Sequence, residues 1–233
     1  MKGEDLLSYI LKKILEYSEE AYGDIAEKFI SEIRRKSCFE HLVSTIISQN
    51  TNWKNVRKAI ENLRKILGTI NPYTISSASL NDLEKALKPA GLYKVKSKWL
   101  KEVAYIIIRD FNGYLDRLKY LPVDKAREVL LEMPGVGFKT ADIILCFCYS
   151  KPVLPIDTHI RRISRRIGLT SSSSYDIIRR ELEKHIDPKE VLKAHLLLIL
   201  FGRNICRARN PLCKICPVNN VCPSSFLKGN DFR

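Results

Sequence analysis

Apolar residues recur every three or four positions along most of the chain, which is the spacing of an amphipathic α-helix. In the first segment Leu6, Ile10 and Ile14 share one face, and the segment 54–67 repeats the pattern from Val56 onward. Glycine and proline separate such segments, and we find no convincing alternation of apolar and polar residues of the kind that marks a half-buried strand. The pattern predicts an all-α fold of about ten helices with short connections. Further helical segments are expected at 94–111, 124–133, 139–149, 157–168, 175–186 and 189–202.

The composition is that of a globular protein. The chain has 233 residues, of which 45% are hydrophobic and 28% are charged, and this length supports a substantial core. Charged residues interrupt every long apolar run before it reaches the roughly 18 residues that cross a bilayer. The segment 1–20 carries acidic residues among its apolar positions and has no small-residue cleavage site. We therefore expect no membrane contact, no secretion and a cytoplasmic location.

The charge balance narrows the choice of partners. Lysine and arginine exceed aspartate and glutamate by enough to give a net charge of +14. Such an excess is typical of proteins that bind a polyanion, and nucleic acid is the commonest one. A basic surface kept for solubility is the alternative that charge alone leaves open.

A turn rich in glycine and proline joins two of the expected helices at 134–137, with the sequence Pro-Gly-Val-Gly. Glycine permits backbone conformations that a Cβ atom forbids, and it lets another surface approach closely. Amides at the start of the following helix, with the positive end of its dipole behind them, form a site for an anion such as a DNA phosphate. A plain helix–turn–helix connection is the alternative for this turn taken alone. The residues expected to bind DNA here are Gly135, Val136, Gly137 and Thr140.

Four of the seven cysteines crowd into the end of the chain with the spacing C-x6-C-x2-C-x5-C, at Cys206, Cys213, Cys216 and Cys222. A secreted disulfide framework would be shorter and evenly rich in cysteine. Structural zinc usually has two CxxC or CxxH pairs, and only one is present, whereas four thiolates suit a [4Fe–4S] cluster. Helical periodicity stops after residue 201, so a metal group is needed to organise this segment. We expect a [4Fe–4S] cluster on these four cysteines, with zinc as the less favoured alternative.

Two further residues complete a pattern that points to a family. Lys139 follows the Pro-Gly-Val-Gly turn by two residues, and Asp157 stands 18 residues later, within Pro-Ile-Asp-Thr-His, at an N-cap position before a basic helix. The turn, the lysine, the aspartate and the cysteines, in this order, resemble the endonuclease III family of the helix–hairpin–helix DNA glycosylase superfamily. The resemblance extends from about residue 25 to residue 223.

The resemblance implies two helical domains with a DNA cleft between them. A central, barrel-like helical domain is expected at 37–148 and includes the helix–hairpin–helix. Residues 1–36 and 149–233 are expected to form the iron–sulfur cluster domain, with its cluster loop at 206–222.

The resemblance also assigns catalytic roles to Lys139 and Asp157, and elementary chemistry supports both. A lysine amine is a nucleophile only when neutral, so we expect Lys139 to be partly buried beside other cations at the positive end of its helix. It would attack the sugar C1′, displace the base and form a Schiff base, from which β-elimination cuts the strand. Asp157 would take up a proton or stabilise the cationic sugar.

A base must leave the duplex before this chemistry can start, and another group must fill the gap. Gln49 is the only glutamine in the chain and ends an apolar helix, where the family has a glutamine-bearing helix and loop. We expect Gln49 or its neighbour Asn50 to enter the gap. Arg207 and Arg209, between the first two tail cysteines, are expected to grip phosphates, as the corresponding loop does in the family. Other expected phosphate contacts are Lys94, Lys96, Lys98, Arg161, Arg162, Arg165 and Arg166.

The sequence therefore predicts a base-excision-repair DNA glycosylase with abasic-site lyase activity. Its expected substrate is double-stranded DNA with an oxidised pyrimidine or an abasic site, which places it at the nucleoid, and we expect a monomer. A glycosylase of the same superfamily for alkylated, deaminated or mismatched bases, with a weak or absent lyase step, is the first alternative. A non-catalytic iron–sulfur DNA-binding protein is the second.

Overall fold

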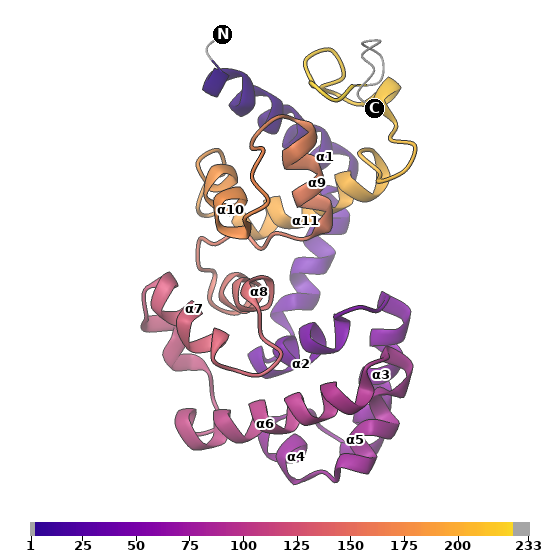
Figure 1. Cartoon of the computed structure of the whole chain (residues 1–233), viewed down its shortest axis with the longest axis vertical. Coiled ribbons are helices and arrows are strands. Elements are labelled where there is room, and N and C mark those ends of the chain that lie inside the picture. The colour runs from indigo at the N-terminus through magenta and orange to yellow at the C-terminus, as the bar shows by residue number, and fades with distance from the viewer. Residues whose placement is uncertain (1–2, 226–233) are drawn as a thin grey trace. The chain divides into compact units, whose positions relative to one another are not determined.

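The structure, a computed structural model, describes residues 3–225, and these residues form helices joined by turns and loops (Figure 1). No strand occurs in this part of the chain, so the predicted all-α fold is confirmed. No helix within it is long and apolar enough to span a membrane. The α-helices are α1 (Gly3–Arg34), α2 (Cys38–Ser48), α3 (Trp53–Leu67), α4 (Pro72–Ser77), α5 (Leu80–Leu87), α6 (Tyr93–Phe111), α7 (Val123–Leu131), α8 (Phe138–Tyr149), α9 (Thr158–Arg166), α10 (Tyr175–Glu183) and α11 (Val191–Asn204). The 3-10 helices are η1 (Lys88–Ala90), η2 (Asp116–Tyr120) and η3 (Cys213–Ile215).

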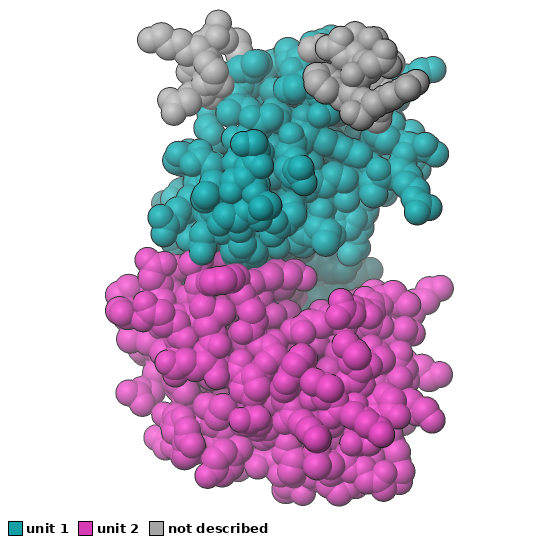
Figure 2. Space-filling model, in the orientation of Figure 1, with its two compact units in different colours: residues 1–32, 150–233 teal, residues 33–149 magenta. Residues whose placement is uncertain are grey.

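The chain forms two compact units, which Figure 2 shows in different colours. Unit 2 is the continuous stretch 33–149 and contains α2 to α8. Unit 1 combines residues 1–32 with residues 150–233, so α1 belongs with the helices that follow α8. Each unit has its own buried apolar core, as expected for a chain of this length.

In unit 2 the long helix α6 contacts α2, α4, α5 and η1 (Figure 1). Its residues Leu100, Val103, Ala104 and Ile107 follow the helical period and are fully buried. The helices α7 and α8 pack on each other, and α8 also packs on α2. The two ends of the helix–hairpin–helix are therefore fixed by packing within one unit.

Unit 1 packs α9 against α10 and α11. The first helix contributes Ile10, Leu11 and Ile14, all fully buried, and Tyr17, whose ring meets the edge of Phe201 on α11 at a centroid distance of 6.3 Å. The amphipathic pattern at the start of the chain thus marks a helix with a real buried face.

The short helices α4 and α5 were not expected from periodicity, because each has too few turns to show it. Each of these helices nevertheless begins after a residue type that commonly caps helices, asparagine for α4 and serine for α5. The Asn71 side chain accepts a hydrogen bond from Thr74 N at 2.9 Å, and Ser79 Oγ accepts one from Asp82 N at 3.1 Å.

Candidate active site and metal centre

The connection between α7 and α8, residues 132–137, is a tight hairpin. Val136 N donates to Met133 O at 3.1 Å, and Gly135 has a φ of +76°. A Cβ atom on Gly135 would lie 2.6 Å from Cε3 of Trp99, so glycine is required here for its conformation and for its contact with the indole. Gly137 differs, because it has no positive φ and nothing lies within 4 Å of its Cβ position. The fold therefore requires glycine at position 135 but not at position 137.

Lys139 lies in the first turn of α8 and lines a pocket of about 420 Å³. Its side chain is exposed, so the expected partial burial of Lys139 is wrong in this structure. Because Lys139 is exposed and lines the pocket, its amine is accessible to a ligand there. The other residues that line the pocket are Gln49, Gly135, Val136, Gly137 and Thr140. Of the expected DNA-binding residues, Val136 and Thr140 are themselves largely buried, with 7% and 4% of their surface exposed.

The loop after α2 brings Gln49 to this hairpin. Gln49 Nε2 donates a hydrogen bond to Gly135 O at 2.7 Å, across 86 positions of sequence. Asn50, the next residue, is exposed and has a φ of +54°, a left-handed conformation that asparagine tolerates better than most residues. The two residues expected to enter the DNA therefore differ, since Gln49 is bound to the hairpin whereas Asn50 projects from the loop.

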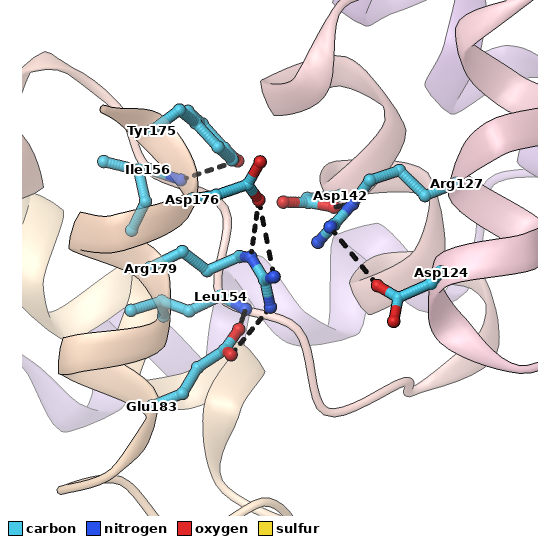
Figure 3. A network of polar contacts seen from close by, with 9 residues as sticks. All are labelled: Asp124, Arg127, Asp142, Leu154, Ile156, Tyr175, Asp176, Arg179 and Glu183. Carbon is cyan, nitrogen blue, oxygen red and sulfur yellow. Dashed lines mark hydrogen bonds and ion pairs between the residues drawn. The ribbon is translucent and has the colours of Figure 1, made fainter.

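A buried ion pair joins the two helices of the hairpin motif. Arg127 Nε on α7 donates to Asp142 Oδ1 on α8 at 2.7 Å, and the Asp142 side chain is fully buried (Figure 3). Asp124, one turn before Arg127, lies 3.6 Å from its guanidinium but is largely exposed. Breaking a buried pair leaves an uncompensated charge, so this contact fixes α7 against α8.

Asp157 is the N-cap of α9, as its sequence position predicts. Its Oδ1 accepts a hydrogen bond from Ile160 N at 2.8 Å, and the residue is half-buried. The irregular segment before it is tied to α10, because Ile156 N donates to Tyr175 Oη at 3.1 Å and Leu154 N donates to Glu183 Oε1 at 2.8 Å (Figure 3). The carboxylate of Asp157 is thus held in unit 1 by its own helix and by the segment that leads to it.

The four tail cysteines line one cavity in unit 1, together with apolar residues of α1 and α11. All four are half-buried. Burial raises the pKa of Cys216 to about 11, and the other three cysteines add to this because neighbouring thiolates repel one another. Within the described residues, no three His, Cys, Asp or Glu side chains are already drawn together as a metal site. The donor set fits a cationic group bound by four thiolates, which would remove this repulsion.

Two arginines expected to contact phosphates instead brace the cysteine segment, residues 206–222. Arg162 on α9 donates to Gly202 O at 2.7 Å and to Cys206 O at 2.9 Å. Arg166 donates to Arg207 O at 2.6 Å and lies 3.4 Å from the sulfur of Cys206. Both guanidinium groups are committed to carbonyls of the same chain, which corrects the expectation for them.

The exposed part of the cysteine segment is its basic loop. Arg207 and Arg209 are both exposed, and Arg207 Nη2 donates a local hydrogen bond to Asn210 O at 3.1 Å. Asn210 has a φ of +49°, which turns the chain back toward Cys213. These two arginines remain candidates for phosphate contacts.

The structure also corrects the expectation for Lys96 and adds a residue that the sequence did not indicate. Lys96 is fully buried, so it does not contact phosphates. Leu92, just before α6, is 55% exposed and has a φ of +49°, which is unusual for a leucine. Only the backbone conformation distinguishes Leu92 from any other surface leucine, and sequence patterns do not report it.

The chain is similar to known proteins over most of its length. Residues 43–188 match the model of the HhH-GPD superfamily base excision DNA repair proteins. The chain is 34% identical to endonuclease III of Sulfolobus acidocaldarius, over 87% of this chain and 91% of that protein, and 32% identical to endonuclease III of Thermotoga maritima, over 88% and 91%. A structure of a non-covalent endonuclease III–DNA complex matches it with a TM-score of 0.79 at 25% identity, covering 98% of this chain and 99% of that one. The predicted resemblance is confirmed, and this chain belongs to the endonuclease III family of the HhH-GPD superfamily of base excision DNA repair proteins.

Proposed function

We propose that this base-excision-repair protein excises oxidised pyrimidines from duplex DNA and cuts the strand at the resulting abasic site. Its enzyme class, a DNA glycosylase and abasic-site lyase, follows from the family to which the chain belongs. The identity of the preferred damaged base is a more specific proposal than the enzyme class. It rests on the overall similarity to endonuclease III, since no contact in the pocket distinguishes one base from another.

The observation that carries the proposal is the position of Lys139. Its amine is exposed in the first turn of α8, in a pocket formed by the hairpin and Gln49. Backbone amides at the start of α8 supply a positive potential in the same place, which suits a DNA phosphate. A nucleophile beside a phosphate site is the arrangement that attack on a sugar of the DNA backbone needs.

In the proposed reaction the neutral amine of Lys139 attacks C1′ of the damaged nucleotide. The bond from C1′ to the base breaks, and the base leaves with the electron pair and takes up a proton. The attached amine gives up one proton, the C1′–O4′ bond breaks and O4′ takes up a proton, which leaves a protonated Schiff base between Lys139 and C1′. Removal of a proton from C2′ then expels the 3′ phosphate, and water releases the enzyme.

Asp157 has the proton-accepting or charge-stabilising role in this proposal. Its carboxylate is half-buried and caps α9, so one oxygen is oriented by the hydrogen bond from Ile160 N. An anion stabilises the positive charge that develops on the sugar as the base departs. An asparagine at this position would preserve the cap but lose the charge.

We further propose that unit 1 holds a [4Fe–4S] cluster through Cys206, Cys213, Cys216 and Cys222. The four cysteine side chains line one cavity, which is consistent with all-thiolate ligation. When bound, the cluster supplies a rigid cross-link for a segment that has little regular structure. It would hold the loop with Arg207 and Arg209 ready to bind phosphates. All proposed groups belong to one chain, so we infer a monomer that acts on chromosomal DNA.

The test is borohydride trapping on a duplex that carries one thymine glycol. The wild-type protein is expected to give a covalent adduct and a cut strand, and Lys139→Gln is expected to give neither. Lys125→Gln is the matched control, because Lys125 is an exposed lysine on α7 of the same unit and pairs with Glu128 at 2.8 Å. Asp157→Asn is expected to fold normally and to lower the excision rate by about 100-fold or more.

The same trap on a preformed abasic site separates the alternatives. Adducts only on the abasic site would retain the lyase and reject thymine glycol as substrate, in favour of alkylated or deaminated bases. Excision without an adduct on either duplex would indicate a glycosylase that uses water. Binding without any cleavage would leave a non-catalytic DNA-binding protein and would refute the proposal.

A further inference from the structure

Lys96 is fully buried, and its ammonium group is enclosed by backbone oxygens. Lys96 Nζ donates to Gln49 O at 2.7 Å, to Ile47 O at 2.8 Å and to Ala90 O at 3.0 Å. Each of its three N–H groups thus has an acceptor, which is the full donor capacity of an ammonium. Burial lowers the pKa of Lys96, and a neutral amine would have one donor too few for the three carbonyls. A charge buried at this cost needs a reason beyond packing.

The three carbonyls belong to two loops that are distant in sequence. Ile47 and Gln49 end α2, and Ala90 ends η1, so the cation lies where helix carbonyls lack partners and the dipole is negative. The first loop continues from Gln49 into Asn50, and the second continues from Ala90 into Leu92. One side chain therefore fixes the α2–α3 loop (residues 49–52) to the η1–α6 loop (residues 91–92).

Both loops present an exposed residue in a strained conformation. Asn50 has a φ of +54° and Leu92 a φ of +49°, and neither is a glycine. A leucine in the left-handed region is strained, and this conformation persists only where the surrounding structure holds it. Asn50 directly follows Gln49, and Leu92 follows Ala90 by two positions, after Gly91, so both lie close in sequence to carbonyls that Lys96 binds. The three hydrogen bonds of Lys96 are thus placed to maintain the backbone conformations of Asn50 and Leu92.

The same helix also supports the hairpin, residues 132–137. Trp99 follows Lys96 by three positions on α6 and packs against Gly135. The Gln49 side chain donates to the carbonyl of Gly135, while Lys96 holds the Gln49 backbone. The first turns of α6 therefore connect both loops with the hairpin that carries the pocket of Lys139.

We propose that Lys96 is a positioning residue for base extrusion, a role that rests on the proposed function. It holds Asn50 and Leu92 at a fixed spacing from the hairpin, so that these side chains enter the DNA helix where the damaged base leaves. A polar and an apolar group at such a point can fill the gap and separate the neighbouring bases. Lys96 touches neither DNA nor the reacting atoms, and it acts through the two loops.

The experiment compares Lys96→Met with wild type on a duplex that contains tetrahydrofuran, a stable abasic analogue, opposite 2-aminopurine. Binding is measured by anisotropy, and the fluorescence of 2-aminopurine reports its displacement from the stack. Lys101→Met is the matched control. Lys101 lies on the same helix and also donates to two carbonyls, including Ala78 O at 2.6 Å, but these belong to the end of α4 and the residue after it.

Wild type and Lys101→Met are expected to raise the fluorescence on binding. Lys96→Met is expected to bind with nearly unchanged affinity, because phosphate contacts dominate it, but to raise the fluorescence far less. On thymine glycol duplex its excision rate is expected to fall by about 10-fold or more, with a much smaller change on a preformed abasic site. Equal losses in Lys96→Met and Lys101→Met, or a full fluorescence rise in Lys96→Met, would overturn the proposal.

If Lys96→Met does not fold, Lys96→Arg retains the charge, but its planar fork fits three converging carbonyls poorly, so a smaller loss of fluorescence is expected. Wild-type fluorescence in a folded Lys96→Arg would then count against the role. The fluorescence assay involves no bond cleavage. A wild-type protein that displaces 2-aminopurine but cuts no DNA would therefore refute the proposed function and leave this inference standing.

Discussion

The hairpin in unit 2 and the cysteine segment in unit 1 are both predicted to contact DNA, yet their structures are stabilised differently. The hairpin joins two packed helices, rests on Trp99 and receives a hydrogen bond from Gln49. The cysteine segment, residues 206–222, contains one short 3-10 helix and few buried residues, and much of its bracing comes from Arg162 and Arg166. The hairpin is therefore fixed by the protein core, whereas the cysteine segment is proposed to depend on the cluster that its four thiols would bind.

This difference in stabilisation follows from how much apolar surface each segment can bury. Helices with apolar faces gain stability by packing, and a turn between two packed helices is held in place by them. The cysteine segment is rich in polar residues and proline, so it cannot offset its own conformational entropy. Bound metal supplies the missing free energy in segments of this kind. Three substitutions and one change of pH test this comparison, in order of decreasing expected effect.

Cys213→Ser is expected to have the largest effect, because it removes one of the four proposed cluster ligands. Iron content should fall from about four atoms per chain to nearly none. Limited proteolysis should then cut within 206–222 much faster than in wild type. Cys38→Ser is the matched control, since Cys38 is also half-buried but lies in unit 2. Full iron content in Cys213→Ser would show that this thiol is not a ligand.

Asp142→Asn is expected to destabilise the helix–hairpin–helix by about 3 kcal/mol, because it removes the buried carboxylate that faces Arg127. Chemical denaturation with far-ultraviolet circular dichroism gives the free energy of unfolding. Asp124→Asn alters the exposed partner of the same arginine and should cost less than about 1 kcal/mol. Similar losses in both variants would mean that burial of Asp142 adds nothing.

Gly135→Ala is expected to cost about 2 kcal/mol from its φ alone, and more from the contact with Trp99. Binding to abasic duplex should weaken with it. Gly137→Ala should leave the melting temperature unchanged, since its Cβ would lie in open space. A loss of DNA binding in Gly137→Ala at full stability would place the DNA backbone against this glycine.

Acidification is expected to have the smallest effect. Burial lowers the pKa of His41, which is 7% exposed on α2 and hydrogen-bonded through Nε2 to Ile33 O at 2.8 Å. Above about pH 6.5 the ring is neutral in both folded and unfolded chains. As the pH falls below this value, the unfolded chain binds the proton first, so the free energy of unfolding decreases. His41→Gln should reduce this decrease between pH 7.5 and 5.5, and an unchanged slope would contradict it.

Local sequence signals predicted several elements well. Helical periodicity indicated the long helices, and Asp157 was identified as an N-cap because capping needs only a short side chain before a helix. The order of turn, lysine, aspartate and cysteines was enough to indicate the family. The short helices α4 and α5 were not predicted, because a helix of one or two turns shows no clear hydrophobic period.

The errors concern the environment of charged side chains. Lys96 was expected on the surface, and Arg162 and Arg166 on DNA, because a sequence gives a residue's charge but not its neighbours. Lys139 was expected to be partly buried and is exposed. Each of these positions depends on carbonyls and helices contributed by distant parts of the chain.

The all-α class, the family and the chemical types available at the site could all be predicted from the sequence. These properties depend on spacing along the chain and on the chemistry of individual side chains. The packed structure was needed to find that Lys96 binds two loops, that Gln49 meets the hairpin and that four thiols share a cavity. Such contacts join residues dozens of positions apart, and their energies arise from burial and hydrogen bonding that exist only once the helices have packed.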